Sequence, residues 1–331
     1  MGFRHVAVLG AGAWGTALAN VAARPGRAVT LWSRDAALAA EMEASRENRR
    51  SLPGVGLADG VLPRADPAEA LAEADLVLMV VPAQHLRATL AALPPFPPDL
   101  PVVLCAKGIE AATGLLMSEV LAAARPGQPV AALSGPSFAA DVGRRRPTAV
   151  TVAAAEAELS RSIAEGLSGP AFRLYHTDDL LGVEIGGAAK NVLAIACGVA
   201  AGMELGASAA AALTARGFAE LTRFGRASGA RSETLMGLSG LGDLVLTCAS
   251  VQSRNFAFGH ALGAGASLAA AAAGRLAEGV ATAPVLCRLA RQRGVDMPVA
   301  EAVAALVAGR TTPGAALDAL MARPARAEGD A

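Results

Sequence analysis

The stretch RHVAVLGAGAWGTALANVAAR, residues 4–24, decides how the first half of the chain folds. Its first six residues predict a short strand, and the alanine-rich residues from 16 onward predict a helix. Between them lies GAGAWG (10–15), which has the spacing G-x-G-x-x-G. A strand, a glycine turn and a helix in this order predict a dinucleotide-binding unit.

Each glycine of this turn has a predicted role. Gly10 permits the tight turn, Gly12 lets the backbone approach a pyrophosphate, and Gly15 lets the helix pack closely on the sheet. The N-terminus of the helix would then face the phosphates. We therefore expect the cofactor to contact Gly10, Gly12, Ala13, Trp14 and Gly15.

The end of the second predicted strand, AVTLW (28–32), favours NADP as the cofactor. An acidic residue at this place would bond the ribose 2′-hydroxyl of NAD, but the sequence continues as SRD. Ser33 and Arg34 are suited to a 2′-phosphate, because a guanidinium matches phosphate geometry. Alternatively, Arg34 lies at the start of a surface helix that Asp35 caps. We expect Arg34 to bind the cofactor and NADPH to be favoured, without excluding NAD.

Strand and helix patterns alternate through the first half of the chain. Further strands are predicted at residues 75–81, 101–106, 129–135 and 147–153. Helices are predicted at residues 67–74, 83–92, 114–124 and 156–166. The strands are continuously apolar, as in a parallel sheet that is covered on both faces. The fold class is therefore α/β, with a Rossmann-type doubly wound dinucleotide-binding domain over residues 1–178.

The second half of the chain is predicted to be helical. Helical patterns occupy residues 208–227, 283–294 and 311–321, and the last of these has Thr312 as a cap and Pro313 in its first turn. We expect an all-helical substrate-binding and catalytic domain over residues 179–323, followed by a polar tail over 324–331. Because a helical second domain often carries a dimer interface, we also expect a homodimer.

Composition excludes several classes of partner. The 29 basic and 29 acidic residues give zero net charge and are spread along the chain, so neither nucleic acid nor an anionic membrane is expected to bind. The basic run GRRRP (143–147) is expected to be a solvated loop. The longest uncharged apolar run, 191–203, is too short to span a bilayer, so no membrane insertion is expected.

The cysteines favour a reducing compartment. There are four, they are far apart, and no two form a CxxC pair, which argues against a metal site or a disulfide framework. The N-terminus has no charged segment followed by an apolar one, as a signal peptide would have. We expect a cytoplasmic protein without a bound metal.

Lysine is rare in this chain: of 29 Lys and Arg residues, only Lys107 and Lys190 are lysines. Lys190 lies in GGAAKNVLAI (186–195), on a predicted helix. Its neighbours at helical spacing are Gly186, Gly187, Asn191, Ala194 and Gly198. This small-residue face lets a backbone or a ligand come close. A desolvated lysine can exchange a proton near neutral pH and an arginine cannot, so we expect a functional acid or base. The alternative is a surface lysine.

Lys107 is the second candidate. It follows a predicted strand in CAKGIE (105–110), at the carboxyl edge of the sheet, where ligands gather in open α/β folds. The alternative is an ordinary loop cation.

Three further segments suggest a binding site. LSGPSFA (133–139) ends a strand with a glycine-proline turn that exposes backbone N–H groups. A glycine-rich loop from residue 237 leads into Asp243, which is either a helix cap or a catalytic partner. SRN (253–255) opens a helix: Ser253 and Asn255 are good cap residues, and Arg254 could anchor a phosphate.

Together these segments resemble the bacterial NAD(P)-dependent glycerol-3-phosphate dehydrogenases over nearly the whole chain. The matching segments are GAGAWGTALA (10–19), CAKGIE, LSGPSFA, EIGGAAKNVLAIACG (184–198), GLGDLVLTC (240–248), SRNFAFG (253–259) and AEGVATA (277–283). The resemblance implies reversible reduction of dihydroxyacetone phosphate to sn-glycerol 3-phosphate by NAD(P)H, which supplies glycerophospholipid synthesis.

The resemblance also implies roles for individual residues. It makes Lys190 the acid/base, places Lys107 at both substrate and cofactor, and lets Asp243 orient the substrate or Lys190. Further substrate contacts are implied for Gly135, Ser137, Ser253, Arg254 and Asn255. Further cofactor contacts are implied for Ala139, Arg254, Leu276 and Glu278. Family members often have tyrosine where this chain has Ser51, so no cofactor role is expected there.

Two other functions stay open at this point. One is a related reductase of 3-hydroxy or 2-oxo acids, which would bind a carboxylate where SRN is better suited to a phosphate. The other is a catalytically inactive NADP-sensing regulator, which would keep the glycine turn without needing Lys107, Lys190 and Asp243 together.

Overall fold

The computed structural model describes residues 2–24, 26–274 and 276–324, so residues 325–331 of the predicted tail lie outside the described residues. The chain forms two compact units. Unit 1 contains the described residues of 1–106 and 117–180, and unit 2 contains those of 107–116 and 181–331. The boundary placed at residue 178 from the sequence stays a prediction.

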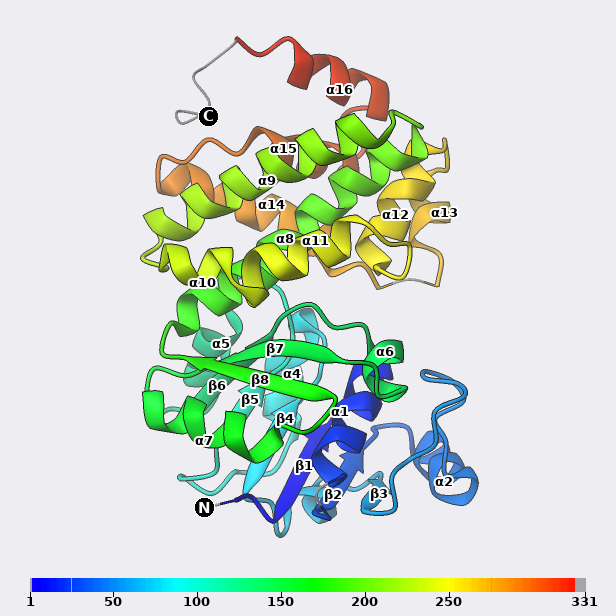
Figure 1. The fold of residues 1–331 in the computed structure, drawn as a ribbon, viewed down its shortest axis with the longest axis vertical. Coiled ribbons are helices and arrows are strands. Elements are labelled where there is room, and N and C mark those ends of the chain that lie inside the picture. Colours follow the sequence, from blue (N-terminus) through cyan, green and yellow to red (C-terminus); the bar gives the residue numbers. More distant parts are fainter. Residues whose placement is uncertain (1, 25, 275, 325–331) are drawn as a thin grey trace. The chain divides into compact units, whose positions relative to one another are not determined.

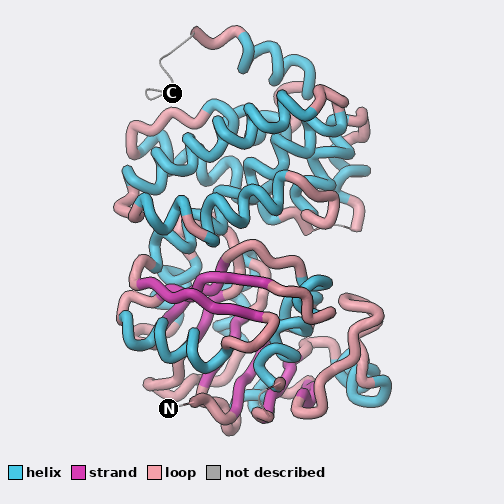
Figure 2. Tube along the Cα trace, in the orientation of Figure 1, coloured by secondary structure: helices cyan, strands magenta, loops and turns pink. Residues whose placement is uncertain are grey.

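Unit 1 is built on an eight-stranded sheet, whose arrows appear in Figure 1 and as magenta tube in Figure 2. The strands are β1 (His5–Leu9), β2 (Ala28–Trp32), β3 (Val61–Arg64), β4 (Leu76–Met79), β5 (Val102–Leu104), β6 (Val130–Ser134), β7 (Thr148–Ala153) and β8 (Phe172–Thr177). Their order is β3-β2-β1-β4-β5-β6-β7-β8, with parallel pairing except between β6 and β7, which is antiparallel. The predicted doubly wound fold is confirmed, but the sheet is not parallel throughout.

Seven α-helices and one 3₁₀ turn connect the strands in the described part of unit 1. They are α1 (Ala13–Ala23), α2 (Ala36–Ser45), α3 (Pro67–Leu71), η1 (Ala83–His85), α4 (Leu86–Ala92), α5 (Met117–Ala124), α6 (Ala139–Gly143) and α7 (Ala157–Leu167). Residues of β1, β4 and β5 such as Val8, Leu78 and Val103 are fully buried. Their burial explains why these strands are continuously apolar in the sequence.

The order of the strands locates a site for a ligand. From β1 the chain adds β2 and then β3 beyond one edge of that strand, and it then returns to add β4 along the other edge of β1. Loops leaving the carboxyl ends of β1 and β4 therefore run in opposite directions, and open α/β sheets bind ligands in the crevice this reversal creates. The glycine turn at residues 10–15 directly follows β1.

Unit 2 is helical, as predicted, and its helices are seen in Figure 1. They are α8 (Leu180–Gly202), α9 (Ala207–Ala227), α10 (Ser232–Met236), α11 (Asp243–Cys248), α12 (Arg254–Gly263), α13 (Leu268–Ala272), α14 (Glu278–Gln292), α15 (Pro298–Val307) and α16 (Pro313–Met321). Thr312 caps α16 by accepting a hydrogen bond from the Ala315 N–H, as expected. The prediction of a glycine-rich loop before Asp243 is wrong, because residues Leu238–Gly242 form a π-helical turn, η2, that leads into α11.

Helix α8 is buried along most of its length. It is long and apolar enough to cross a membrane, but 83% of its most apolar window is buried inside the structure. Its glycines permit this burial: a Cβ on Gly198 would lie 2.1 Å from the Phe256 carbonyl oxygen, and one on Gly186 would lie 2.8 Å from that of Ser239. The predicted close approach of other backbone to the small-residue face is confirmed, with α12 and η2 as the partners.

Candidate functional site

The glycine turn of unit 1 has the geometry that a dinucleotide site requires. Gly10 has a φ of +122°, and a Cβ there would lie 2.6 Å from the Val80 carbonyl oxygen, just past the end of β4. A Cβ on Gly15 would lie 1.8 Å from the Gly10 carbonyl oxygen, whereas one on Gly12 would meet nothing within 4 Å. Gly10 and Gly15 are therefore needed for packing, and Gly12 faces open space that a ligand can use.

The start of α1 fits a pyrophosphate. Gly12 is its N-cap residue and makes no side-chain capping bond, and the first turn contains no acidic residue. The partial positive charge of this helix end therefore meets no competing carboxylate from its own first turn. Trp14 packs against Phe172, with ring centroids 6.5 Å apart.

Asn48, which the sequence did not single out, braces the glycine turn. This asparagine is fully buried, and its Nδ2 donates to the Ala11 carbonyl oxygen at 2.9 Å and to Thr16 Oγ1 at 2.8 Å. The Thr16 hydroxyl in turn donates to the Gly12 carbonyl oxygen at 2.9 Å. These bonds hold the carbonyl groups of Ala11 and Gly12 toward buried side chains of the protein. The conformation of the turn is therefore fixed before any ligand binds.

At the end of β2, the structure supports the alternative reading of Asp35. Asp35 caps α2 by accepting a hydrogen bond from the Leu38 N–H, and its other carboxylate oxygen pairs with Arg50 Nη1 at 2.9 Å. The hydrogen bond from the Leu38 N–H is the main cause that lowers the pKa of Asp35; desolvation opposes it, and the interaction with Arg50 lowers the pKa further. Ser33 is buried and Arg34 is exposed.

In unit 2, Lys190 is buried in the middle of α8, so the alternative of a surface lysine is wrong. Its Nζ donates to Asp243 Oδ1 at 3.1 Å and to Thr247 Oγ1 at 2.8 Å. Asp243 and Thr247 lie one turn apart on α11, and the Thr247 hydroxyl also donates to Asp243 Oδ1, at 3.2 Å. The sequence did not reveal Thr247, although its place four residues after Asp243 puts both on one helix face.

Lys107 joins the same group. It lies in the segment 107–116 of unit 2, and its Nζ donates to the other carboxylate oxygen of Asp243, Oδ2, at 2.7 Å. The side chain of Lys107 is 14% exposed, which is not the setting of an ordinary loop cation. Both lysines of the chain therefore bind one carboxylate, which is itself 1% exposed. We call Lys107, Lys190, Asp243 and Thr247 the lysine cluster.

The electrostatics of the lysine cluster favour proton transfer near neutral pH. Burial lowers the pKa of Lys190 to about 8, against the attraction of Asp243 and with help from the Lys107 charge. Burial alone would raise the pKa of Asp243, but Lys107 and Lys190 outweigh it and hold that pKa below its usual value. Asp243 therefore stays ionised while Lys190 can change its charge under mild conditions.

Two asparagines connect the lysine cluster to the neighbouring helices. Asn191 donates from Nδ2 to the Lys107 carbonyl oxygen at 2.8 Å and accepts from Asn255 Nδ2 at 2.9 Å. Asn255 in turn accepts from the Gly279 N–H in the first turn of α14 at 2.9 Å. Asn255 was predicted as a site residue but not as a link to Lys107, and Asn191 was noted only as a neighbour of Lys190.

The start of α12 has the predicted cap. Ser253 accepts a hydrogen bond from the Phe256 N–H, and Arg254 is the exposed first residue of the helix. The first turn contains no acidic residue, so this helix end is suited to an anion. Two further predicted cofactor contacts of unit 2 lie at the start of α14: Leu276, two residues before the helix, is 44% exposed, and Glu278 is the first residue of the helix.

The remaining predicted residues lie in one turn of unit 1 after β6. Gly135 has a φ of +140°, and a Cβ there would lie 2.9 Å from Val150 Cα, so glycine is required. Ser137 Oγ donates to the Gly135 carbonyl oxygen at 3.1 Å, and Ala139 begins α6. The structure therefore brings these three residues together on one short segment.

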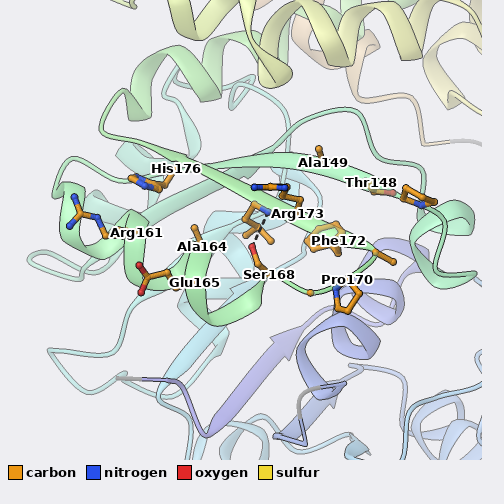
Figure 3. A pocket seen from close by; sticks show the side chains of 14 residues that line it. Thr148, Ala149, Arg161, Ala164, Glu165, Ser168, Pro170, Phe172, Arg173 and His176 are labelled. Carbon is orange, nitrogen blue, oxygen red and sulfur yellow. Dashed lines mark hydrogen bonds between the residues drawn. The ribbon is translucent and has the colours of Figure 1, made fainter.

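Two other features of unit 1 contain none of the predicted site residues. In the basic run 143–147, three arginines are exposed, as expected of a solvated loop, and Arg146 pairs with Asp141 at 2.7 Å. Figure 3 shows a hollow lined by residues of α7, β7 and β8, among them Arg161, Glu165 and Arg173. Its charged side chains make no compact constellation comparable to the lysine cluster.

Metal ligation has no counterpart in the part of the chain that the structure describes: no group of three or more His, Cys, Asp or Glu side chains there could hold an ion. The four cysteines are buried and form no disulfide.

Comparison with known proteins identifies the family. The family models described as the N-terminus and the C-terminus of NAD-dependent glycerol-3-phosphate dehydrogenase match residues 5–160 and 179–318. A glycerol-3-phosphate dehydrogenase (NAD(P)+) of Bradyrhizobium sp. strain BTAi1 is 61% identical over 98% of this chain and 99% of its own. One of Beijerinckia indica is 58% identical over 98% of each. The chain belongs to the NAD-dependent glycerol-3-phosphate dehydrogenase family.

Solved structures agree with this assignment. The crystal structure of glycerol-3-phosphate dehydrogenase from Coxiella burnetii has a TM-score of 0.90 and 38% identity, covering 97% of this chain and 99% of that one. A 2-dehydropantoate 2-reductase of Methylococcus capsulatus, at 16% identity and a TM-score of 0.60, shares the fold alone. The resemblance seen in the sequence, and the expectation of an oxidoreductase, are confirmed.

The lysine cluster makes a prediction about stability. Asp243→Asn should lower the unfolding free energy by about 3 kcal/mol at pH 7, because it leaves a buried cation without its counter-charge. The loss should shrink as the pH rises through about 8, because Lys190 of the folded parent protein then becomes neutral and a neutral amine needs no carboxylate. Denaturant unfolding of the parent protein and the variant at pH 7 and pH 10 measures the loss of stability and its dependence on pH.

Asp318→Asn is the matched control, because Asp318 is an exposed residue of α16 in the same unit. Its effect should stay within about 0.5 kcal/mol at either pH. A loss for Asp243→Asn that is the same at pH 7 and pH 10 would contradict the proposed charge balance.

Proposed function

We propose that this chain catalyses the reversible NAD(P)H-dependent reduction of dihydroxyacetone phosphate to sn-glycerol 3-phosphate, which supplies glycerophospholipid synthesis. The observation that carries the proposal is the pairing of both lysines with one buried carboxylate, in a chain that belongs to the dehydrogenase family. A catalytically inactive NADP sensor would have no need of this buried charge arrangement, which is costly to maintain.

Lys190 is the general acid of the reduction in this proposal. The reduced nicotinamide, when bound, supplies the hydride that the carbonyl carbon of the substrate accepts. As the electron pair of the C=O bond moves onto the oxygen, Lys190 gives that oxygen a proton and becomes a neutral amine. In the reverse direction the neutral amine removes the proton of the hydroxyl group. A pKa of about 8 suits both directions, since general acids and bases work best near the ambient pH.

Lys107 and Asp243 support this step. Lys107 places its side-chain amine beside the carbonyl oxygen and stabilises the negative charge that develops there, which lowers the barrier. Asp243 binds both amines and thereby orients Lys190. Thr247 provides the second acceptor for the Lys190 amine. Asn191 holds the backbone of Lys107 through the carbonyl oxygen, and so fixes the distance between the two lysines.

The phosphate of the substrate is assigned to the start of α12. Arg254 supplies a guanidinium at a helix N-terminus, where the macrodipole also attracts an anion. Ser253 and Asn255 flank it and complete the phosphate site. Gly135 and Ser137 are assigned further substrate contacts. A carboxylate-bearing oxo acid would fit this arrangement less well than a phosphate ester does.

The cofactor is assigned to the glycine turn, with NADPH favoured over NADH. Gly10, Gly12, Ala13, Trp14 and Gly15 form that turn, and Gly12 leaves the space that a pyrophosphate needs. Arg34 is assigned to the ribose end of the cofactor. Further contacts are proposed for Lys107, Ala139, Arg254, Leu276 and Glu278.

The setting of the enzyme is proposed on broader grounds. The free cysteines and the balanced charge support a cytoplasmic protein that binds neither nucleic acid nor membrane. The burial of α8 supports the absence of membrane insertion. A homodimer stays a proposal that rests on the helical second unit alone.

Replacing Lys190 should remove most of the turnover and leave cofactor binding nearly unchanged. Lys190→Ala should lower kcat for dihydroxyacetone phosphate by about 10²–10⁴-fold, because general acid catalysis contributes that much. NADPH affinity, measured by fluorescence titration, should change less than about threefold. Arg216→Ala, at an exposed position of α9, is the control and should keep full activity. Near-normal turnover of Lys190→Ala would refute its role as acid.

The phosphate assignment is tested by Arg254→Ala. This variant should raise KM for dihydroxyacetone phosphate by about tenfold or more, because one charge-assisted hydrogen bond contributes roughly 1.5–3 kcal/mol. Unphosphorylated dihydroxyacetone should be reduced as poorly by the variant as by the parent enzyme. Equal losses on the two substrates would remove the phosphate role, and faster turnover of a 2-oxo acid by the parent enzyme would favour the alternative reductase.

A further inference from the structure

The loop between α2 and β3, residues 46–60, is fastened to the cofactor side of unit 1. Asn48 is hydrogen-bonded to Ala11 in the glycine turn and to Thr16 in the first turn of α1. Farther along the loop, the buried Asn20 of α1 donates to the Gly56 carbonyl oxygen and accepts from the Ala58 N–H, both at 2.9 Å. The position of the loop is therefore set by buried side-chain hydrogen bonds at two points.

Arg50 lies two residues after Asn48 and reaches a second part of the same site. Its Nη1 binds Asp35 Oδ2 at 2.9 Å, just past the end of β2. The backbone N–H of Asp35 donates to Ser33 Oγ at 3.2 Å. Residues 48–50 thus contact both the glycine turn and the end of β2.

In this fold these two places lie beside the two phosphate groups of NADP, the pyrophosphate and the 2′-phosphate. In this fold the pyrophosphate lies at the glycine turn, and the 2′ position of the adenosine ribose lies at the end of the second strand. One oxygen of Asp35 is already bound to the Leu38 N–H and the other to Arg50. A 2′-phosphate arriving there meets the guanidinium groups of Arg34 and Arg50.

The ion pair between Arg50 and Asp35 is easily exchanged. The side chain of Arg50 is 69% exposed and that of Asp35 is 43% exposed, so the pair is solvated. A phosphate carries more charge than a carboxylate and presents more acceptor oxygens to the planar guanidinium, which makes it the stronger partner. Asp35 keeps its bond to Leu38 when Arg50 turns away, so α2 stays capped.

We propose that Arg50 is a specificity-determining residue that binds the 2′-phosphate of NADP, and that Asp35 holds its guanidinium in place until the phosphate binds. This inference rests on the proposed dinucleotide function of unit 1. It adds a second guanidinium to Arg34, from a loop in which the sequence predicted no cofactor contact.

The test compares two nucleotides that differ only in the 2′-phosphate, adenosine 2′,5′-bisphosphate and adenosine 5′-monophosphate. Calorimetric titration of the full chain should show that Arg50→Ala weakens binding of the bisphosphate by about tenfold, the effect of losing one charge-assisted contact. Binding of the monophosphate should change less than twofold. Arg49→Ala is the matched control, because Arg49 is the adjacent exposed arginine and pairs with Glu47 instead, at 3.4 Å. It should leave both affinities within twofold of the parent.

Three results would overturn the inference while leaving dinucleotide binding intact: no loss in Arg50→Ala, an equal loss for both nucleotides, or an equal loss in Arg49→Ala. Failure of the parent chain to bind either nucleotide would instead overturn the proposed function of unit 1. In kinetics, Arg50→Ala should raise KM for NADPH by a similar factor and leave KM for NADH unchanged. An equal rise for both cofactors would count against a role at the 2′ position.

Discussion

The proposed catalytic site depends on one buried carboxylate that both lysines of the chain share. Asp243 binds Lys190 with one oxygen and Lys107 with the other, and it is almost wholly removed from solvent. One negative charge between two amines leaves a net positive site, which is what a developing oxyanion needs. Burial, with a smaller contribution from the Lys107 charge, lowers the pKa of Lys190, so this amine gives up its proton more readily than a solvated lysine does. Two arginines in these positions would hold the same charge but could not exchange a proton.

The packing around the lysine cluster holds its side chains in place. Glycines let η2 and α12 lie directly against α8, so that Asp243 and Asn255 come within hydrogen-bonding distance of residues in the middle of that helix. Asn191 holds the backbone of Lys107 by a hydrogen bond, and Lys107 lies only three residues after the end of β5. In unit 1 the same principle recurs, since Asn48 fixes the glycine turn through buried hydrogen bonds.

Patterns among neighbouring residues predicted most of the fold. The features that the sequence did not predict depend on tertiary contacts. The glycine turn and the continuous apolar strands predicted the doubly wound unit, because both signals come from neighbouring residues. β3 contains Pro63, and β8 alternates buried Phe172 and Leu174 with exposed residues, so neither gives the continuous pattern of the other strands. Lysine scarcity pointed to Lys107 and Lys190, and the resemblance linked Asp243 to the substrate or Lys190. That one carboxylate binds both lysines depends on tertiary packing, which no local pattern shows. Asn48 and Arg50 have no local signature, and Thr247 is marked only by its place one helical turn after Asp243.

The most direct test of the shared carboxylate is the pH dependence of kcat for reduction of dihydroxyacetone phosphate, in the parent enzyme and in Asp243→Asn. Reduction needs protonated Lys190, so kcat should fall as the pH rises through about 8 in the parent enzyme. Asp243 raises the pKa of Lys190, so the midpoint in the variant should move to lower pH, and the residual activity should be greatest in acid. An unchanged midpoint, or one that moves to higher pH, would contradict the account.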